Sequence, residues 1–94
     1  MAVRILVSGF VQGVGYRAWL QTTAEAHGLT GWTRNLRDGR VEAVLAGPED
    51  AVRRVSDLAR RGPPAARVAD LSERPARADE IDLAGGRFRV LPTV

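Results

Sequence analysis

A short glycine-rich stretch, residues 9–15, separates a strand-like pattern from a helix-like pattern. Before it, residues 3–9 read VRILVSG, and this run of β-branched side chains predicts a strand. After it, apolar groups recur from Tyr16 at the three- and four-residue spacing of a helix that turns one face to a core. Gly13 and Gly15 can adopt positive φ angles that other residues avoid. The sequence therefore predicts a sharp strand-to-helix corner whose backbone carries few Cβ atoms.

The middle of the chain predicts a β-hairpin followed by a second helix. Residues 29–47 contain two strand-like runs joined at Asp38-Gly39, a dipeptide typical of hairpin turns. Pro48, followed by two acidic residues, is typical of a helix start. The helical spacing continues until Gly62 and two prolines end it.

The last third of the chain predicts two more strands. Residues 66–74 form a weaker strand pattern, residues 75–86 are loop-like, and residues 87–92 alternate like a final strand. The resulting order is βαββαβ with one late strand added. This order predicts an α+β sandwich in which two helices cover one face of a mainly antiparallel sheet. We expect all 94 residues to form a single domain.

Composition excludes several kinds of protein. With no cysteine there is no disulfide, thiol nucleophile or thiolate metal site, and the single histidine, His27, cannot build a multi-histidine metal cluster. No apolar run approaches the ~18 residues of a membrane span and no secretion signal is recognisable, so we expect a cytoplasmic protein. The net charge is +3, and all 14 basic residues are arginines scattered among 11 acidic residues. This scatter differs from the long basic block of a nucleic-acid-binding tail.

The corner at residues 12–17, QGVGYR, combines three sources of positive potential. Successive backbone N–H groups in a glycine turn can point into one concavity. A helix that begins near Tyr16 adds unpaired N–H groups and the positive end of its dipole. Arg17 adds a guanidinium that stays charged at any physiological pH. Together these features indicate a site for an anion the size of a phosphate, although a glycine turn beside a solvated arginine has the same spacing.

Residues 13–18, GVGYRA, also match the loose dinucleotide-binding pattern G-x-G-x-x-G/A. That interpretation requires a parallel βαβ unit and an acidic residue about 20 positions further on. Here a hairpin follows the helix, and the hairpin turn itself accounts for Asp38. The sequence therefore argues against a dinucleotide site.

Asn35 lies three residues before the hairpin turn, on the same strand face as Gly31 and Thr33. Its amide offers both donors and an acceptor, which suits it to hold a water molecule together with a phosphate oxygen or a main-chain group. A lone asparagine near a turn is also a common surface residue. The residue pattern leaves both interpretations open.

Two motifs in the chain resemble the signatures of the acylphosphatase family. The first, G-x-V-Q-G-V-x-F-R, corresponds to residues 9–17. The second, G-x-V-x-N-x-x-D-G-x-V-E-x-x-x-x-G, corresponds to residues 31–47 and includes Asn35. Residues 62–68 and the closing RFRVLPT are also similar to the family, so the resemblance covers most of the chain.

The resemblance implies a ferredoxin-like sandwich and the hydrolysis of acyl phosphates to a carboxylate and inorganic phosphate, with no metal and no cofactor. It implies that Arg17 grips the phosphate oxygens and that Asn35 orients the attacking water. The loop expected to cradle the phosphate through its backbone N–H groups comprises Gln12, Gly13, Val14, Gly15, Tyr16 and Arg17. Since no general base is evident and His27 is expected at the far end of the helix, we expect the bound phosphate to accept the water's proton.

Three positions depart from the family pattern. Tyr16 stands where phenylalanine is usual, and its hydroxyl needs a partner or solvent. Phe10 replaces a basic or polar residue at the rim, and Thr33 replaces a valine in the strand. None of these changes removes a residue that the chemistry requires.

Two other functions are alternatives. A protein of the same fold can hold a phosphate or carboxylate as a non-catalytic binding or regulatory module, although Arg17 and Asn35 are both present. RNA-recognition domains share the element order but stack bases on aromatic side chains of the sheet, and residues 40–46, RVEAVLA, contain none. We therefore expect a small acyl phosphate as substrate, no nucleic-acid or membrane partner, and a monomer.

Overall fold

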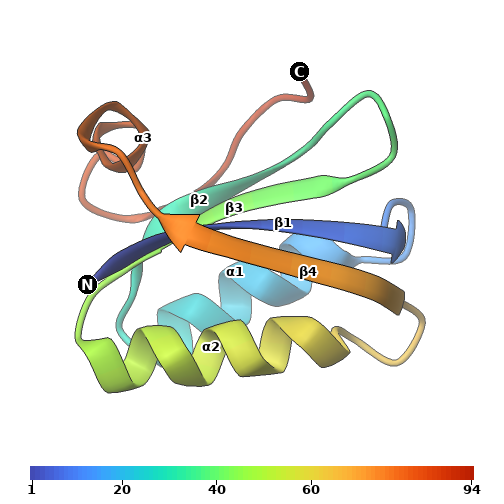
Figure 1. Cartoon of the computed structure of the whole chain (residues 1–94), viewed down its shortest axis with the longest axis horizontal. Coiled ribbons are helices and arrows are strands. Elements are labelled where there is room, and N and C mark those ends of the chain that lie inside the picture. Colours follow the sequence, from blue (N-terminus) through green and yellow to red (C-terminus); the bar gives the residue numbers. More distant parts are fainter.

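The computed structural model describes all 94 residues, and two long helices cover one face of a five-stranded sheet (Figure 1). The strands are β1 (Ala2–Phe10), β2 (Thr30–Asn35), β3 (Val41–Ala46), β4 (Arg67–Pro75) and β5 (Phe88–Val90). The helices are α1 (Tyr16–Ala26), α2 (Glu49–Arg61) and α3 (Ala78–Asp82). The strand order in space is β4-β1-β3-β2-β5, and only the β2–β5 pair is parallel. The predicted sandwich with an added C-terminal strand is confirmed. None of the helices has the length and apolar character needed to cross a membrane.

Alternate side chains of the central strands form the core under α1 and α2. On β1 these include Val3, Ile5 and Val7, each at most 4% exposed. The helices contribute apolar residues at helical spacing, such as Leu20 on α1 and Val55 on α2, both fully buried. Every second residue of the strands and every third or fourth residue of the helices thus contribute side chains to the same core.

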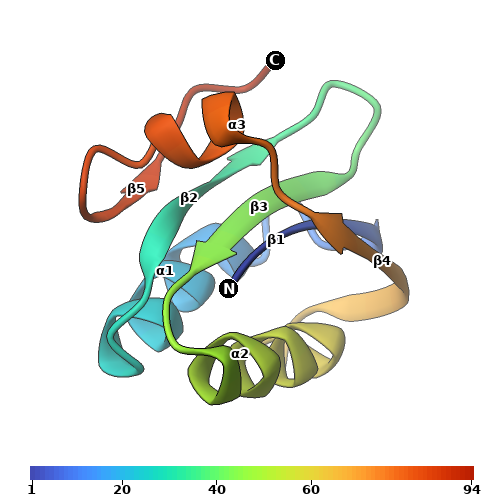
Figure 2. The same cartoon turned by 60° about the vertical axis from the view of Figure 1, so that its left-hand side comes forward.

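The expectation of a loop over residues 75–86 is wrong, because α3 lies within it and packs on the opposite face of the sheet from the long helices (Figure 2). The indole Nε1 of Trp32, which is fully buried, donates a hydrogen bond of 2.7 Å to the carbonyl oxygen of Glu80 in this helix. A helix of five residues is too short to show a periodic apolar face. Its position depends on a tryptophan 48 residues away in the sequence.

The final strand is shorter than the expected 87–92, since only Phe88–Val90 pairs as a regular strand. It runs parallel to β2, with Gly31 opposite Phe88. Hydrogen bonds continue beyond it, from Leu91 N–H to the Thr33 carbonyl (2.9 Å) and from Val94 N–H to the Asn35 carbonyl (3.2 Å). The C-terminal residues therefore follow β2 up to its last residue.

The topology brings both sequence motifs to one end of the sheet. Strands β1 and β2 are each antiparallel to β3, so they run in the same direction and end at the same edge. The corner that follows Phe10 and the hairpin that follows Asn35 consequently lie at the same end of the molecule (Figure 1).

Tyr16 fastens the start of α1 to the end of α2. Its hydroxyl donates a hydrogen bond of 2.7 Å to the carbonyl oxygen of Ala59. That carbonyl lacks its usual helical donor, because the residue four positions on is Pro63, which has no N–H. Burial raises the pKa of Tyr16, so the hydroxyl keeps its proton and remains a donor. The hydroxyl therefore supplies a cap for the second helix.

Glu80 is a nearly buried carboxylate that holds α3 in place. Arg74 donates two hydrogen bonds to its oxygens, of 2.9 and 2.8 Å, and the backbone N–H of Arg77 donates a third of 2.9 Å. These hydrogen bonds, with the largest effect from Arg74, lower the pKa of Glu80 to about 2 from 4.5. Because the folded pKa lies below the unfolded one, this stabilisation is present above pH 4.5 and is lost as the pH falls towards 2.

Replacing Tyr16 by phenylalanine is expected to lower the free energy of unfolding by about 1–3 kcal/mol, since the buried Ala59 carbonyl would lose its donor. Urea unfolding followed by circular dichroism measures this change. If the free energy of unfolding falls with urea concentration at the same slope in the variant and the parent, both expose the same amount of surface on unfolding. A variant as stable as the parent would contradict the capping role.

Replacing Glu80 by glutamine is expected to lower the free energy of unfolding at pH 7 by roughly 1–3 kcal/mol, since charge-assisted hydrogen bonds are lost. The difference from the parent should be smaller at pH 3, where the stabilisation by the parent carboxylate is partly lost. Urea unfolding at the two pH values tests this. Asp82→Asn removes an exposed carboxylate from the same helix and is the matched control. Equal destabilisation at both pH values would contradict the ionic role of Glu80.

Candidate active site

The corner after β1 leaves the first backbone N–H groups of α1 without a side-chain acceptor. Gly13 and Gly15 have φ angles of 73° and 80°, in the left-handed region that glycine adopts at little cost. Gly15 is the N-cap residue, no side chain caps the helix, and its first turn contains no acidic residue. The positive end of the helix dipole is therefore not offset locally, an arrangement that favours a bound anion.

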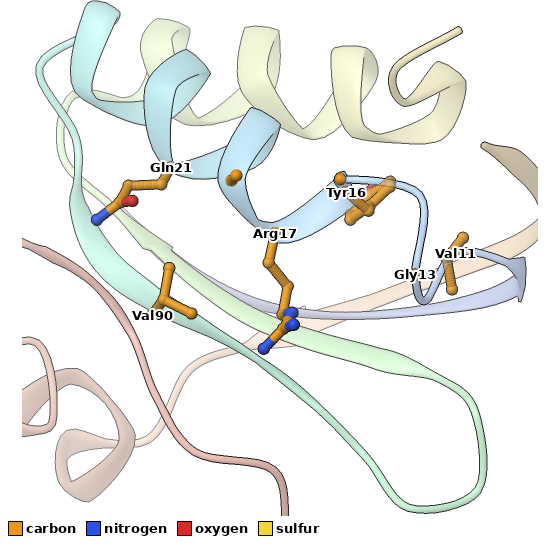
Figure 3. A pocket seen from close by; sticks show the side chains of 8 residues that line it. Val11, Gly13, Tyr16, Arg17, Gln21 and Val90 are labelled. Carbon is orange, nitrogen blue, oxygen red and sulfur yellow. The ribbon is translucent and has the colours of Figure 1, made fainter. Parts of the chain in front are cut away.

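Arg17 projects from this first turn into a cavity of about 220 Å³ (Figure 3). Its side chain points from α1 towards β2 and β3, and it makes no ion pair and no hydrogen bond with the rest of the chain. The lining residues are Val11, Gly13, Gly15, Tyr16, Arg17, Ala18, Gln21 and Val90. An unpaired guanidinium beside open helix N–H groups suits two or more oxygens of one phosphate.

Gln12 connects this corner to the hairpin. Its side-chain Nε2 donates hydrogen bonds to the carbonyl oxygens of Leu36 (2.7 Å) and Arg40 (2.9 Å). Both donor hydrogens of the amide are thus used within the protein. The side chain of Gln12 holds the glycine corner against the residue that follows Asn35.

Asn35 is the last residue of β2, and its side-chain Oδ1 is buried without a hydrogen-bond partner. A buried carbonyl oxygen without a donor costs free energy, typically about 1–3 kcal/mol. Its hydrogen-bonding capacity suits a donor that arrives from outside the protein, such as a water O–H group. The backbone carbonyl oxygen of Asn35 accepts the hydrogen bond from the Val94 N–H that is described above.

The structure shows the surroundings of the three residues that depart from the family pattern. The hydroxyl of Tyr16 has its partner in Ala59. Thr33 is fully buried, and its Oγ1 donates a hydrogen bond of 3.1 Å to the Glu42 carbonyl oxygen. Phe10 is 59% exposed at the end of β1.

Four of the six residues expected in the cradle, Gly13, Gly15, Tyr16 and Arg17, line the cavity, whereas Gln12 and Val14 do not. Asn35 is also outside the cavity lining.

The sequence patterns did not identify Gln21 or Val90 as residues of the site. Gln21 lies four residues after Arg17, so helical spacing alone predicts that the two share a face. Val90 gave no local signal, because the parallel β2–β5 pairing brings it there.

No group of three or more His, Cys, Asp or Glu side chains is gathered anywhere in the structure. His27, the only histidine, is the C-cap of α1, where its ring Nδ1 lies 2.8 Å from the Thr23 carbonyl oxygen. It is 11 residues beyond Tyr16, roughly 16 Å along the helix axis. The site thus contains backbone N–H groups, a guanidinium and an amide, and no carboxylate or imidazole.

Comparison with known proteins shows the family of this chain. The family model for acylphosphatase matches residues 3–89. Curated acylphosphatases from Bradyrhizobium diazoefficiens and Rhodopseudomonas palustris are 50% and 53% identical to the chain, covering 98% and 97% of it and 95% and 94% of their own lengths. The crystal structure of an acylphosphatase from Bacillus subtilis superposes with a TM-score of 0.81 at 36% identity, covering 96% of this chain and 97% of that one.

The glycine corner, Arg17 and Asn35 therefore lie in a chain that matches acylphosphatases in sequence and in fold over nearly its whole length. The chain belongs to the acylphosphatase family, and its activity is the hydrolysis of acyl phosphates.

Proposed function

We propose that Arg17 and the backbone N–H groups of residues 12–17 bind the phosphate group of the acyl phosphate and that Asn35 orients the attacking water. The observation that carries this assignment is the unpaired guanidinium of Arg17 beside a helix start with no cap and no acidic residue. The phosphate would sit on the helix N-terminus, with its charge met by donors that the fold already holds in place.

Phosphoryl transfer asks the protein mainly for positioning and charge stabilisation. Arg17 and the backbone donors stabilise the charge on the phosphoryl oxygens. Asn35 accepts a hydrogen bond from the water through its otherwise unpartnered Oδ1 and thereby directs the water's oxygen at the phosphorus. The attack breaks the bond between phosphorus and the carboxyl oxygen, and the carboxylate leaves.

We propose that the phosphate itself takes the water's proton and that neither a metal nor a cofactor takes part. The residues that line the cavity include no carboxylate and no imidazole that could act as a base. They also offer no set of ligands for a metal.

We further propose that residues 1–94 work as one domain, as a monomer, in the cytoplasm and without a nucleic-acid partner. Only five large apolar side chains are exposed, namely Met1, Phe10, Leu83, Val90 and Val94. The β3 strand at the centre of the sheet presents no aromatic side chain on which a base could stack.

Arg17→Gln and Asn35→Ala are each expected to reduce the hydrolysis of benzoyl phosphate by at least ~10², measured with EDTA present throughout. The arginine variant should raise KM as well as lower kcat, whereas the asparagine variant should act mainly on kcat. Arg54→Gln removes an exposed arginine from α2 and controls for net charge. Full activity in either site variant, or loss of parent activity with EDTA, would contradict the assigned roles.

His27→Gln is expected to leave both the rate and its pH dependence unchanged, because the proton acceptor is the substrate and His27 lies at the far end of α1. Steady-state rates with benzoyl phosphate between pH 4 and pH 9 test this. An inflection of the rate that is present in the parent and disappears in the variant would show that the histidine takes part.

A further inference from the structure

The C-terminal segment, residues 91–94, stays beside β2 after the last residue of β5 (Figure 2). At its start, Leu91 N–H donates a hydrogen bond of 2.9 Å to the Thr33 carbonyl oxygen. The Leu91 side chain packs against the small buried cluster that includes Trp32. The beginning of the segment is therefore anchored both by its backbone and by its side chain.

The segment then departs from the regular pattern of a parallel pair of strands. In that pattern, donors two positions apart bind carbonyl oxygens two positions apart, so Thr93 would donate to the Asn35 carbonyl oxygen. The donor is instead Val94, one residue further along, at 3.2 Å. One extra residue is thus accommodated at the position of Pro92 and Thr93, as in a β-bulge, a feature that is over-represented next to active sites.

Val94 binds the main chain of β2 on both sides of Leu36. Its N–H donates to the Asn35 carbonyl oxygen, and its own carbonyl oxygen accepts a hydrogen bond of 2.9 Å from the Arg37 N–H. These are the two bonds by which one residue pairs with a parallel neighbour. The Val94 side chain is 52% exposed, so the attachment is made by the backbone and not by the side chain.

The peptide group between Asn35 and Leu36 is consequently bonded at both of its polar atoms. Its carbonyl oxygen accepts from Val94, and its N–H donates to the Arg40 carbonyl oxygen at 2.8 Å. The same Arg40 oxygen accepts the side-chain amide of Gln12 from the glycine corner. The buried Oδ1 of Asn35 has no comparable support, since it has no partner in the protein. The direction of this side chain therefore depends on the backbone that carries it.

We propose that Val94 is a positioning residue for Asn35, because its backbone fixes the end of β2 in the orientation from which the Asn35 amide directs the attacking water. The inference rests on the proposed role of Asn35, and Val94 acts through that residue and not on the substrate. A misplacement of about 1 Å far from the reacting atoms can cost about 10² in rate. Loss of the Val94 bond should therefore slow the attack while leaving phosphate binding at Arg17 unchanged.

Val94→Pro removes the N–H that binds Asn35, and Val94→Ala, which keeps this N–H, is the matched control. With benzoyl phosphate, we expect Val94→Pro to lower kcat about tenfold and Val94→Ala to keep the parent value. The inhibition constant of inorganic phosphate should stay within about twofold of the parent value in both variants, because the glycine corner and Arg17 are unchanged. Circular dichroism and urea unfolding check that each variant is folded under the assay conditions.

Combination with Asn35→Ala separates a positioning role from a general loss of structure. If Val94 acts through Asn35, Val94→Pro should lower the residual kcat by less than about twofold when residue 35 is already alanine. A tenfold loss in both backgrounds would overturn the proposal.

Three other results would also overturn it. These are the parent kcat in Val94→Pro, a rise in the phosphate inhibition constant that matches the fall in kcat, and an unfolded Val94→Pro protein, which would make the segment a structural element. Full activity of Asn35→Ala alone would instead contradict the assigned role of Asn35, and this inference with it.

Discussion

Burial of alternate side chains of β1 and β3 under the two long helices is the constraint on which the rest of the structure depends. Val7 of β1 and Val41 of β3 are paired in register, and both are fully buried. A shift of one residue would turn every buried side chain of a strand to the other face, so the core determines the register. The register in turn determines where each strand ends, and therefore where the glycine corner and the hairpin meet.

Two glutamine amides then position the groups around Arg17. On one side Gln12 binds carbonyl oxygens of the hairpin, and on the other Gln21 binds a carbonyl oxygen of β5. Both amides bind backbone carbonyl oxygens of segments that are distant in the sequence. The geometry of the site therefore depends on hydrogen bonds between different elements. A site assembled this way is held in place before the substrate arrives, which is the condition under which fixed donors stabilise a developing charge most effectively.

The distribution of charge separates the site from the rest of the surface. Glu42 bridges Arg4 and Arg34 at 2.8 and 2.9 Å, and Glu80 pairs with Arg74. These carboxylates lie on the sheet face opposite the long helices, where they neutralise arginines. The first turns of α2 and α3 contain acidic residues, whereas the first turn of α1 contains no acidic residue. Arg17 consequently has no carboxylate partner within the chain.

The local patterns of the sequence determined the two long helices, the hairpin and the glycine corner with Arg17, because periodicity and turn residues depend on near neighbours in the chain. Asn35 was singled out only by the resemblance to the acylphosphatase motifs. Those patterns could not decide that residues 78–82 form a helix, since a tryptophan in β2 and an arginine in β4 hold it. Nor could they show that Gln12 binds the hairpin and that Val90 lies beside Arg17. Trp32 lies 48 positions from Glu80 and Gln12 lies 24 positions from Leu36, and only the packed sheet brings such residues together.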